Sequence, residues 1–310
     1  MLADTETWLA THTWHDPQWT LAELLRAKGN RTVSVVLPAL NEEATVAEVV
    51  ATVLPLVGTL VDECVVVDSG STDDTVTVAR AAGARVVGQG EVLPELPARP
   101  GKGEVLWRAL AATTGDLLVF LDSDLVDPDP GFVPALLGPL LTRDEVALVK
   151  GFYRRPLRIE NEESGTGGGR VTELLARPVL AALRPELSGV IQPLGGEYAV
   201  RRELAESLPF APGYGVEIGL LLDTHSRLGL AGLAQVNLGV RKHRNRNLQQ
   251  LGVMARQILG TALSRCVPGA AVDAAEFTQF VQVGGEWLPR EHEVALADRP
   301  PMRDTRTPAS

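Results

Sequence analysis

Gly115-Asp-Leu-Leu-Val-Phe-Leu-Asp-Ser-Asp124 is a run of apolar residues that ends in two carboxylates one residue apart. The run predicts a buried strand, and because alternate side chains of an extended chain share a face, Asp122 and Asp124 can point the same way while Ser123 points away. Two convergent carboxylates suit a divalent cation such as Mg²⁺, which usually completes its shell with water and substrate phosphates. Asp and Ser also favour turns, and Asp127-Pro-Asp-Pro130 follows, so a turn without a metal is the alternative.

Strand-like and helix-like segments alternate around this run. The expected strands cover residues 32–37, 62–67, 84–87, 115–121 and 145–150, and the expected helices cover residues 42–54 after Asn41 as a cap, 75–82, 102–113 and 132–141. This order implies right-handed crossovers, a mostly parallel sheet and a ligand crevice at the carboxyl ends of the strands. Polar loops at 38–43, 68–74 and 122–124 each follow a strand, so we expect all three to border one cleft.

The second half of the chain has a less regular pattern. The expected helices are 171–183 with an interruption at Pro178, 201–208, 215–228 and 248–263, and the expected strands are 195–200 and 236–240. Residues 164–170 are rich in glycine and predict a flexible loop, and the charged, proline-containing residues from about 290 onward predict a loose tail. At the other end, Trp8, Trp14 and Trp19 favour packing of the N-terminal segment on the body of the protein, because indole rings bury much area.

The 310 residues carry a formal net charge of −10. That charge argues against a general binder of nucleic acid or anionic membranes, although a local basic cluster can still serve one small anion. No apolar run is long enough for a secretory core or a membrane span, so we expect a cytoplasmic protein without a span. With only Cys64 and Cys266, the sequence indicates neither a disulfide framework nor a cysteine metal site.

Two strand-to-helix turns of the first half carry candidate binding groups. In Pro38-Ala-Leu-Asn-Glu-Glu43, exposed backbone groups and Glu42 could grip a ribose or a uracil edge; a turn that only caps a helix is the alternative. Lys102 opens a helix between two glycines, where a phosphate would be favoured, although a lone lysine there can also simply face solvent.

Two segments of the second half suggest anion and metal binding. Gly167-Gly-Gly-Arg-Val-Thr172 combines closely approachable backbone amides, the Arg170 guanidinium and a helix start, which suits a carboxylate or phosphate; a flexible linker is the alternative. Arg241-Lys-His-Arg-Asn-Arg-Asn247 follows an apolar strand, so His243 could supply a nitrogen ligand that Mn²⁺ tolerates well, provided that Asp124 lies nearby. Otherwise the basic run is a solvated face and the histidine is structural.

These motifs together resemble a known family. The first-half motifs resemble the nucleotide-sugar half of GT-A glycosyltransferases; they are Leu37-Pro-Ala-Leu-Asn-Glu-Glu43, Val67-Asp-Ser-Gly-Ser-Thr-Asp-Asp74, Gly101-Lys-Gly103 and Phe120-Leu-Asp-Ser-Asp124. The second-half motifs narrow the resemblance, which covers about residues 10 to 290, to glycosyltransferase family 81; they are Gly168-Gly-Arg-Val-Thr172, Gly213-Tyr-Gly-Val-Glu217 and Arg241-Lys-His-Arg-Asn245.

The resemblance implies an α/β GT-A (Rossmann-like) fold with a mostly parallel central sheet and a C-terminal acceptor-side extension. It implies a retaining glucosyltransferase that moves glucose from UDP-glucose to 3-phosphoglycerate with Mg²⁺ or Mn²⁺, as the first step toward methylglucose lipopolysaccharide, and a homodimer. We accordingly divide the chain into a Trp-rich N-terminal segment (1–30), a nucleotide-sugar half (31–150), an acceptor half (151–290) and a flexible tail (291–310).

The resemblance also assigns candidate residues to each substrate. The uridine and the ribose would be held by Pro38, Ala39, Leu40, Glu42, Ser69, Lys102, Asp122 and Ser123. The metal would be ligated by Asp124 and His243, and the glucose or the diphosphate would face Tyr214, Glu217 and Arg241. The 3-phosphoglycerate would be taken by Gly169, Arg170, Thr172 and Asn245. Among these residues the resemblance implies that the catalytic ones are Glu217, Asp124 and Arg241.

The residue after Glu217 bears on the stereochemistry. Inverting GT-A enzymes often carry a second acid at this position, which acts as base for the attacking hydroxyl, whereas here the residue is Ile218. Without that base, front-face attack is favoured, in which the departing diphosphate oxygen accepts the proton and a metal stabilises the developing charge. Glu217 would then orient the sugar rather than form a covalent intermediate.

Three other functions remain open from the sequence. An inverting family-2-like enzyme with a lipid or polysaccharide acceptor would need a span or an apolar groove. An enzyme that transfers mannose from GDP-mannose to a glycerate acceptor differs only in donor. A nucleotide-sugar-binding module without turnover would not need Asp122, Asp124 and Glu217 together.

Overall fold

The computed structural model describes residues 1–159, 162–167, 169–240, 247–270 and 275–306. Its strands are β1 (Thr13–Trp14), β2 (Val33–Ala39), β3 (Glu63–Asp68), β4 (Arg85–Gly88), β5 (Leu117–Phe120), β6 (Leu148–Ile159), β7 (Glu162–Gly167), β8 (Tyr198–Arg201), β9 (Leu233–Val240), β10 (Glu276–Val283) and β11 (Glu286–Glu293). Its α-helices are α1 (Ala3–Thr11), α2 (Leu21–Lys28), α3 (Val46–Val53), α4 (Thr75–Ala81), α5 (Lys102–Ala112), α6 (Phe132–Thr142), α7 (Arg177–Leu183), α8 (Arg202–Ser207), α9 (Val216–Leu228), α10 (Leu248–Cys266) and α11 (Met302–Arg306).

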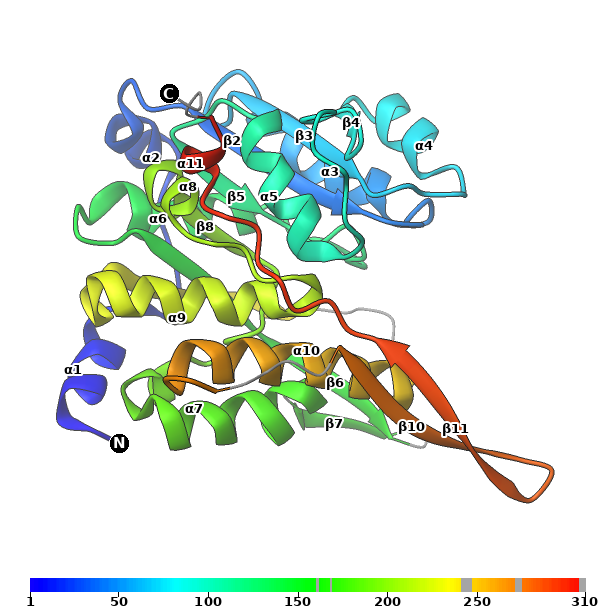
Figure 1. Ribbon diagram of the computed structural model, residues 1–310. Coiled ribbons are helices and arrows are strands. Elements are labelled where there is room, and N and C mark those ends of the chain that lie inside the picture. The colour runs from blue at the N-terminus through cyan, green and yellow to red at the C-terminus, as the bar shows by residue number, and fades with distance from the viewer. Residues whose placement is uncertain (160–161, 168, 241–246, 271–274, 307–310) are drawn as a thin grey trace.

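Within the described residues, nine strands form one mixed sheet in the order β1-β9-β6-β8-β5-β2-β3-β4, with β7 added beside β6 (Figure 1). The half that contains β5, β2, β3 and β4 is parallel throughout. Strand β8 is antiparallel to both of its neighbours, β5 and β6, and the parallel pairing resumes between β6, β9 and β1. The expected α/β architecture with a mostly parallel central sheet is therefore confirmed.

Both faces of the sheet are covered, which explains why its central strands are apolar at consecutive positions rather than at alternate ones. Val36 and Phe120 belong to the core under α5, whereas Val35 and Val119 belong to the core on the opposite face, under α3 and α6. Because strand side chains alternate between faces, each central strand contributes to both cores.

The Trp-rich N-terminal segment packs on the body, as the sequence predicts. The Trp8 side chain is buried, and its Nε1–H donates to the Leu233 carbonyl at 2.8 Å. The rings of Trp14 and Trp19 are 5.7 Å apart. Gly138 of α6 leaves the space that Trp19 fills, since a Cβ at this glycine would lie 2.2 Å from the indole.

Two local expectations are wrong. Asn41 does not cap the first crossover helix, because α3 begins at Val46 after Thr45. Asn41 instead adopts a φ of 56°, and its side-chain oxygen accepts from the backbone N–H of Thr72 at 2.8 Å, which ties the loop at 38–43 to the loop at 68–74. Residues 164–167 do not form a loop: they belong to β7, because pairing with the extended strand β6 outweighs the low strand propensity of glycine and serine.

The C-terminal part differs most from expectation. Residues 276–293 form the β10–β11 hairpin, which projects from the body in Figure 1, and the chain then runs back across the helical layer to α11. The loose tail expected over 291–310 is therefore wrong through residue 306: Val294 and Met302 are buried, and Arg299 pairs with Phe210 through the backbone. Charged residues that look solvent-exposed in the sequence find buried partners here. Residues 307–310 lie outside the described part.

Candidate active site

A cavity of about 440 Å³ lies at the carboxyl edge of the parallel half of the sheet. The cavity is lined by most of the residues that the sequence assigns to the donor and its metal, which are Pro38, Ala39, Leu40, Glu42, Ser69, Lys102, Asp122, Ser123, Asp124 and Tyr214. Glu217 and the residues of the second-half basic run are not among its lining residues. The remaining wall comes from residues that the sequence did not single out, which are Gln89, Ala98, Arg99, Pro100 and Val105, together with Gly101. The roles of all these residues toward a ligand stay predictions.

Side-chain to backbone hydrogen bonds hold the three polar loops together, as a shared cleft requires. Ser69 donates to the Ala39 carbonyl through both its backbone N–H and its hydroxyl, each at 3.0 Å. Ser123 is almost fully buried, and its hydroxyl donates to the Pro38 carbonyl at 2.7 Å. Ser123 therefore ties the strand β5 loop to the end of β2, and the carboxylates on either side of it are placed accordingly.

Lys102 lies between two carboxylates. Its Nζ is 2.6 Å from Asp122 Oδ1 and 2.6 Å from Glu217 Oε1, so the first residue of α5 joins the β5 loop to the first turn of α9. Burial alone would lower the pKa of Lys102, but the charges of Asp122 and Glu217 outweigh burial and raise it well above the ordinary value. Lys102 thus lines the cavity as a paired cation and is not a lone solvent-facing side chain.

A second lysine, which sequence reasoning missed, lies behind this group. Lys150 of β6 is buried, its Nζ donates to the Gly195 carbonyl at 2.6 Å, and it lies 4.9 Å from the centroid of the Tyr198 ring. The pKa of Lys150 is lowered to about 8, chiefly by burial; Glu217, Glu197 and Asp122 oppose this shift, and Lys102 adds to it. A single lysine at the end of an apolar run looks the same in the sequence whether its side chain is buried, as here, or exposed to water.

Two glycines permit the close approach of these elements. Gly196, just before β8, faces Asp122: a Cβ there would lie 2.4 Å from both carboxylate oxygens. Gly103, in the first turn of α5, faces the backbone before α9, where a Cβ would lie 2.0 Å from the Ala211 carbonyl oxygen. The start of α5 and the end of β5 can therefore converge on Lys102 only with glycine at these positions.

The residues expected to bind the acceptor are placed less completely. Gly169 is half-buried and Arg170 is exposed at the start of a helix, which continues through a π-helical turn over Thr172–Ala176 into α7, where Pro178 stands near the start. Thr172 is buried, and none of these three lines the cavity described above. Arg241, His243 and Asn245 lie outside the described residues.

Tyr214 lines both this cavity and a second one. The second cavity, of about 520 Å³, is lined by Tyr214, by residues at the start of α10, and by Arg290 and His292 of β11. Tyr214 therefore separates the donor-side cavity from a hollow on the side of the second-half elements. Its backbone N–H is fixed by Gln257 Oε1 of α10 at 2.9 Å.

The donor set in the cavity fits a hard divalent cation. Asp122 and Asp124 both line the cavity and supply carboxylate oxygens, the ligand type that Mg²⁺ and Mn²⁺ accept. Over the described residues, no group of three or more histidine, cysteine or acidic side chains converges on one point. That arrangement suits a metal whose remaining ligands come from a substrate and water.

Comparison with known proteins places the chain. The model of the Glycosyl transferase family 2 matches residues 34–179. The glucosyl-3-phosphoglycerate synthase of Mycolicibacterium smegmatis (strain ATCC 700084 / mc(2)155) is 64% identical over 299 residues, which cover 96% of this chain and 98% of the relative. The chain belongs to the glucosyl-3-phosphoglycerate synthase family. The GT-A type of fold is confirmed with it.

Crystal structures of this family share the fold. The crystal structure of glucosyl-3-phosphoglycerate synthase from Mycobacterium tuberculosis in complex with Mn²⁺, UDP and phosphoglyceric acid is 59% identical, with a TM-score of 0.89 over 96% of this chain and 100% of that chain. A second structure of the M. tuberculosis enzyme, with Mn²⁺, UDP-glucose and phosphoglyceric acid, is 60% identical, with a TM-score of 0.87 over 95% of this chain and 98% of that chain. The similarity therefore extends over both halves of the chain.

Proposed function

We propose that the protein transfers glucose from UDP-glucose to 3-phosphoglycerate and releases glucosyl-3-phosphoglycerate and UDP. The observation that carries the proposal is the sheet-edge cavity in which Asp122, Asp124 and Lys102 converge, in a chain 60% identical to an enzyme crystallised with Mn²⁺, UDP-glucose and phosphoglyceric acid. An inverting enzyme with a membrane acceptor is not favoured. Within the described residues, no helix has both the length and the hydrophobicity that crossing a membrane requires.

The donor occupies the cavity with its uridine between the ends of β2 and β3. Pro38, Ala39, Leu40 and Glu42 form one wall of this part and Ser69 forms another. The diphosphate then extends toward Asp122, Ser123 and Asp124. Asp124, with His243 as second ligand, would hold Mg²⁺ or Mn²⁺, and the bound metal supplies electrophilic stabilisation of the departing UDP.

The glucose faces Tyr214, Glu217 and Arg241. Lys102 fixes the Glu217 carboxylate at 2.6 Å, so Glu217 can orient the sugar hydroxyls from a defined position. The next residue, Ile218, is fully buried, so this turn of α9 presents no second carboxylate that could deprotonate the acceptor. We therefore propose retention by front-face attack: the acceptor hydroxyl oxygen bonds to the anomeric carbon as the bond to the diphosphate oxygen breaks, and that oxygen takes the hydroxyl proton.

The acceptor is held by the second half. Gly169, Arg170, Thr172 and Asn245 would take the phosphate and carboxylate of 3-phosphoglycerate, because a helix start with a guanidinium and small residues suits an anion. This assignment corresponds to a nucleotide-sugar half over 31–150 and an acceptor half over 151–290, behind the segment 1–30. A homodimer, a cytoplasmic location and the role in methylglucose lipopolysaccharide synthesis belong to the same proposal.

The test is UDP release by the purified protein, with and without 3-phosphoglycerate and with and without Mg²⁺ or Mn²⁺. Release should require both the acceptor and the metal, should fall at least about 100-fold in Asp124→Ala, because electrostatic stabilisation of the leaving group is lost, and should persist in the exposed control Asp144→Ala. Release that ignores the acceptor, or that survives Asp124→Ala, would refute the proposal. GDP-mannose in place of UDP-glucose tests the second donor, and the anomeric configuration of the product by NMR tests retention.

A further inference from the structure

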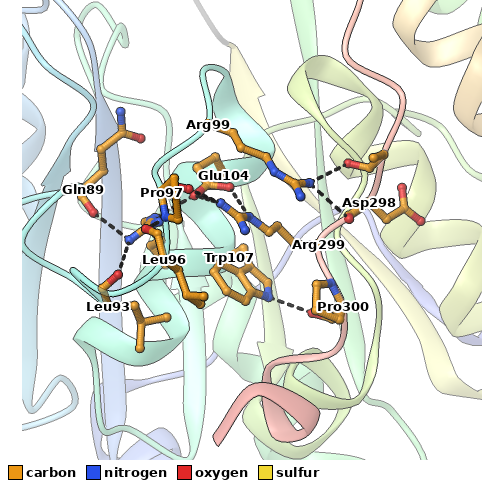
Figure 2. Close-up of polar contacts among 12 residues, drawn as sticks. Gln89, Leu93, Leu96, Pro97, Arg99, Glu104, Trp107, Asp298, Arg299 and Pro300 are labelled. Atoms are coloured by element: carbon orange, nitrogen blue, oxygen red, sulfur yellow. Dashed lines mark hydrogen bonds and ion pairs between the residues drawn. The ribbon is translucent and has the colours of Figure 1, made fainter.

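The C-terminal strap, defined as residues 294–301, packs against α5, and its Arg299 contacts Glu104 of α5 and the loop that precedes this helix (Figure 2). Arg299 is 8% exposed and forms a two-pronged pair with Glu104 of α5: Nε lies 2.6 Å from Oε2 and Nη2 lies 2.8 Å from Oε1. The guanidinium also lies 4.9 Å from the centroid of the Trp107 ring, and Trp107 Nε1–H donates to the Pro300 carbonyl at 2.8 Å. The strap is therefore fixed at Arg299 from two sides.

The same arginine holds the loop that walls the cavity. This donor loop, residues 89–99, connects β4 to α5 without regular secondary structure. Arg299 Nη2 donates to the Pro97 carbonyl at 2.6 Å, and in the opposite direction Arg99 of the loop donates to the Ala297 and Asp298 carbonyls of the strap at 3.1 and 3.3 Å. Since Arg99 itself lines the cavity, the strap contacts the cavity wall directly.

The other side of Glu104 is occupied by Arg108, which holds the rest of the donor loop. Arg108 Nε lies 2.6 Å from Glu104 Oε1, and its guanidinium donates to loop carbonyls, among them those of Gln89 at 3.2 Å and Leu96 at 2.6 Å. Gln89 in turn donates from Nε2 to the Ser69 carbonyl at 3.1 Å. Gln89 and Ser69 both line the cavity, so a continuous chain of hydrogen bonds runs from the strap to the residues that would contact the nucleotide.

The packing of Arg108 and Arg299 against both Glu104 and the donor loop has a physical reason. Two buried guanidiniums on one carboxylate leave an excess positive charge, and burying it is tolerable only where further acceptors are supplied. The carbonyls of the donor loop are those acceptors. The loop and the buried cluster consequently depend on each other: the cluster needs the carbonyls, and the loop, which has no ladder or helix of its own, takes its conformation from the two arginines.

We infer that Arg299 is a positioning residue for the nucleotide part of the donor: with Glu104 it sets the wall formed by the donor loop, so that the C-terminal strap is a functional part of the donor site. The inference rests on the proposed function. Because a preformed wall lowers the ordering cost of binding, loosening it should weaken binding of UDP and UDP-glucose. The acceptor and the reacting carbon lie elsewhere, so the loss should be seen in the donor KM rather than in kcat or in the acceptor KM.

The experiment compares Arg299→Met, Arg299→Lys and the control Arg303→Ala, whose exposed arginine lies just beyond the strap, in the full-length protein. Calorimetry with UDP and Mn²⁺ should show a Kd about tenfold higher in Arg299→Met, because a charge-assisted hydrogen bond to the loop is lost. The KM for UDP-glucose should rise in parallel, while kcat and the KM for 3-phosphoglycerate stay within about twofold. Arg299→Lys, which keeps a cation opposite Glu104, should recover most of the loss, and Arg303→Ala should match the wild type.

A folded Arg299→Met that binds UDP as the wild type does, or that loses donor and acceptor affinity equally, would overturn the inference. Hydrogen exchange on the wild-type protein decides the question even if that variant does not fold. Binding of UDP with Mn²⁺ should protect amides of the donor loop and of the strap together, and should leave the β10–β11 hairpin unchanged; a strap that does not respond would also overturn the inference. A wild-type protein that binds no UDP would instead refute the donor assignment on which the inference rests.

Discussion

Gly196→Ala should move a carboxylate of the site without changing the fold. A Cβ at Gly196 would lie 2.4 Å from both Oδ1 and Oδ2 of Asp122, and the φ of this glycine is not in the left-handed region, so alanine strains only the contact. Ordinary contact between a carbon and an oxygen begins near 3.4 Å. The Asp122 carboxylate must therefore shift by about 1 Å, a displacement that can lower a rate about 100-fold when it misplaces a reacting or binding group.

The displacement of the Asp122 carboxylate also affects two neighbouring charged residues. Asp122 forms an ion pair with Lys102 at 2.6 Å, and Lys102 also forms an ion pair with Glu217. A displaced Asp122 therefore either lengthens its contact with Lys102 or moves Lys102 and Glu217 as well. We expect kcat/KM for UDP-glucose to fall about 100-fold, and the melting temperature to change by less than about 2 °C, because the clash is relieved by a side chain rather than by backbone.

The assay is UDP release under saturating 3-phosphoglycerate, with calorimetry of UDP and Mn²⁺ to separate binding from turnover. Gly131→Ala is the matched control, because a Cβ at Gly131 would meet only the exposed Asp129 side chain, at 3.0 Å, and neither residue lines the cavity. The reasoning is refuted if Gly196→Ala keeps the wild-type kcat/KM, since Asp122 would then have no required position. It is equally refuted if the variant loses activity together with a large drop in melting temperature, since the loss would then come from the fold.

Two further predictions concern stability. The pKa of Lys150 is about 8 in the folded protein against 10.5 ordinarily, so between these pH values the unfolded state binds more protons than the folded state. The unfolding free energy of the wild type, relative to that of Lys150→Met, should therefore rise by about 2.5 kcal/mol between pH 7 and pH 10, as measured by urea unfolding at both pH values. A difference between the two proteins that does not change with pH would contradict the shift. Trp8→Phe removes the donor to the buried Leu233 carbonyl and should lower the unfolding free energy by about 2 kcal/mol at unchanged kcat, and a loss below about 0.5 kcal/mol would show that α1 is not anchored there.

Local patterns in the sequence were enough to predict the cavity. The apolar runs of β2, β3 and β5 each carry their own strand signal, and each is followed by a polar loop, so parallel crossovers alone bring Ser69 and Asp124 to the same edge. The position of Asn41 was misjudged because a cap and a loop-to-loop tie use the same side chain. Only the three-dimensional structure distinguishes the two uses.

Contacts between distant residues could not be predicted in this way. Arg299 and Glu104 are separated by 195 positions, and Arg299 stands in a segment whose charge and proline content are typical of solvent-exposed chain, whereas Glu104 is a single acid in the first turn of a predicted helix. Lys150 lies within β6 at the end of an apolar run, and it contacts Gly195 and Tyr198, which come from another part of the chain. A charged residue carries no local sign of whether its partner is water or a buried carboxylate, so the expectation of a loose tail was wrong.

The two lysines of the site have different consequences for an anionic substrate. Lys102 was expected to favour a phosphate as a free cation at a helix start, but it is already paired with Asp122 and Glu217. Its charge therefore serves first to allow two carboxylates to lie near each other in a largely buried place, where unpaired they would repel each other. A diphosphate entering this cavity meets carboxylates whose repulsion Lys102 only partly offsets, in a protein of net charge −10. Besides Arg99 of the cavity wall, a divalent cation bound at Asp124 would supply compensating charge, so turnover should depend on the metal.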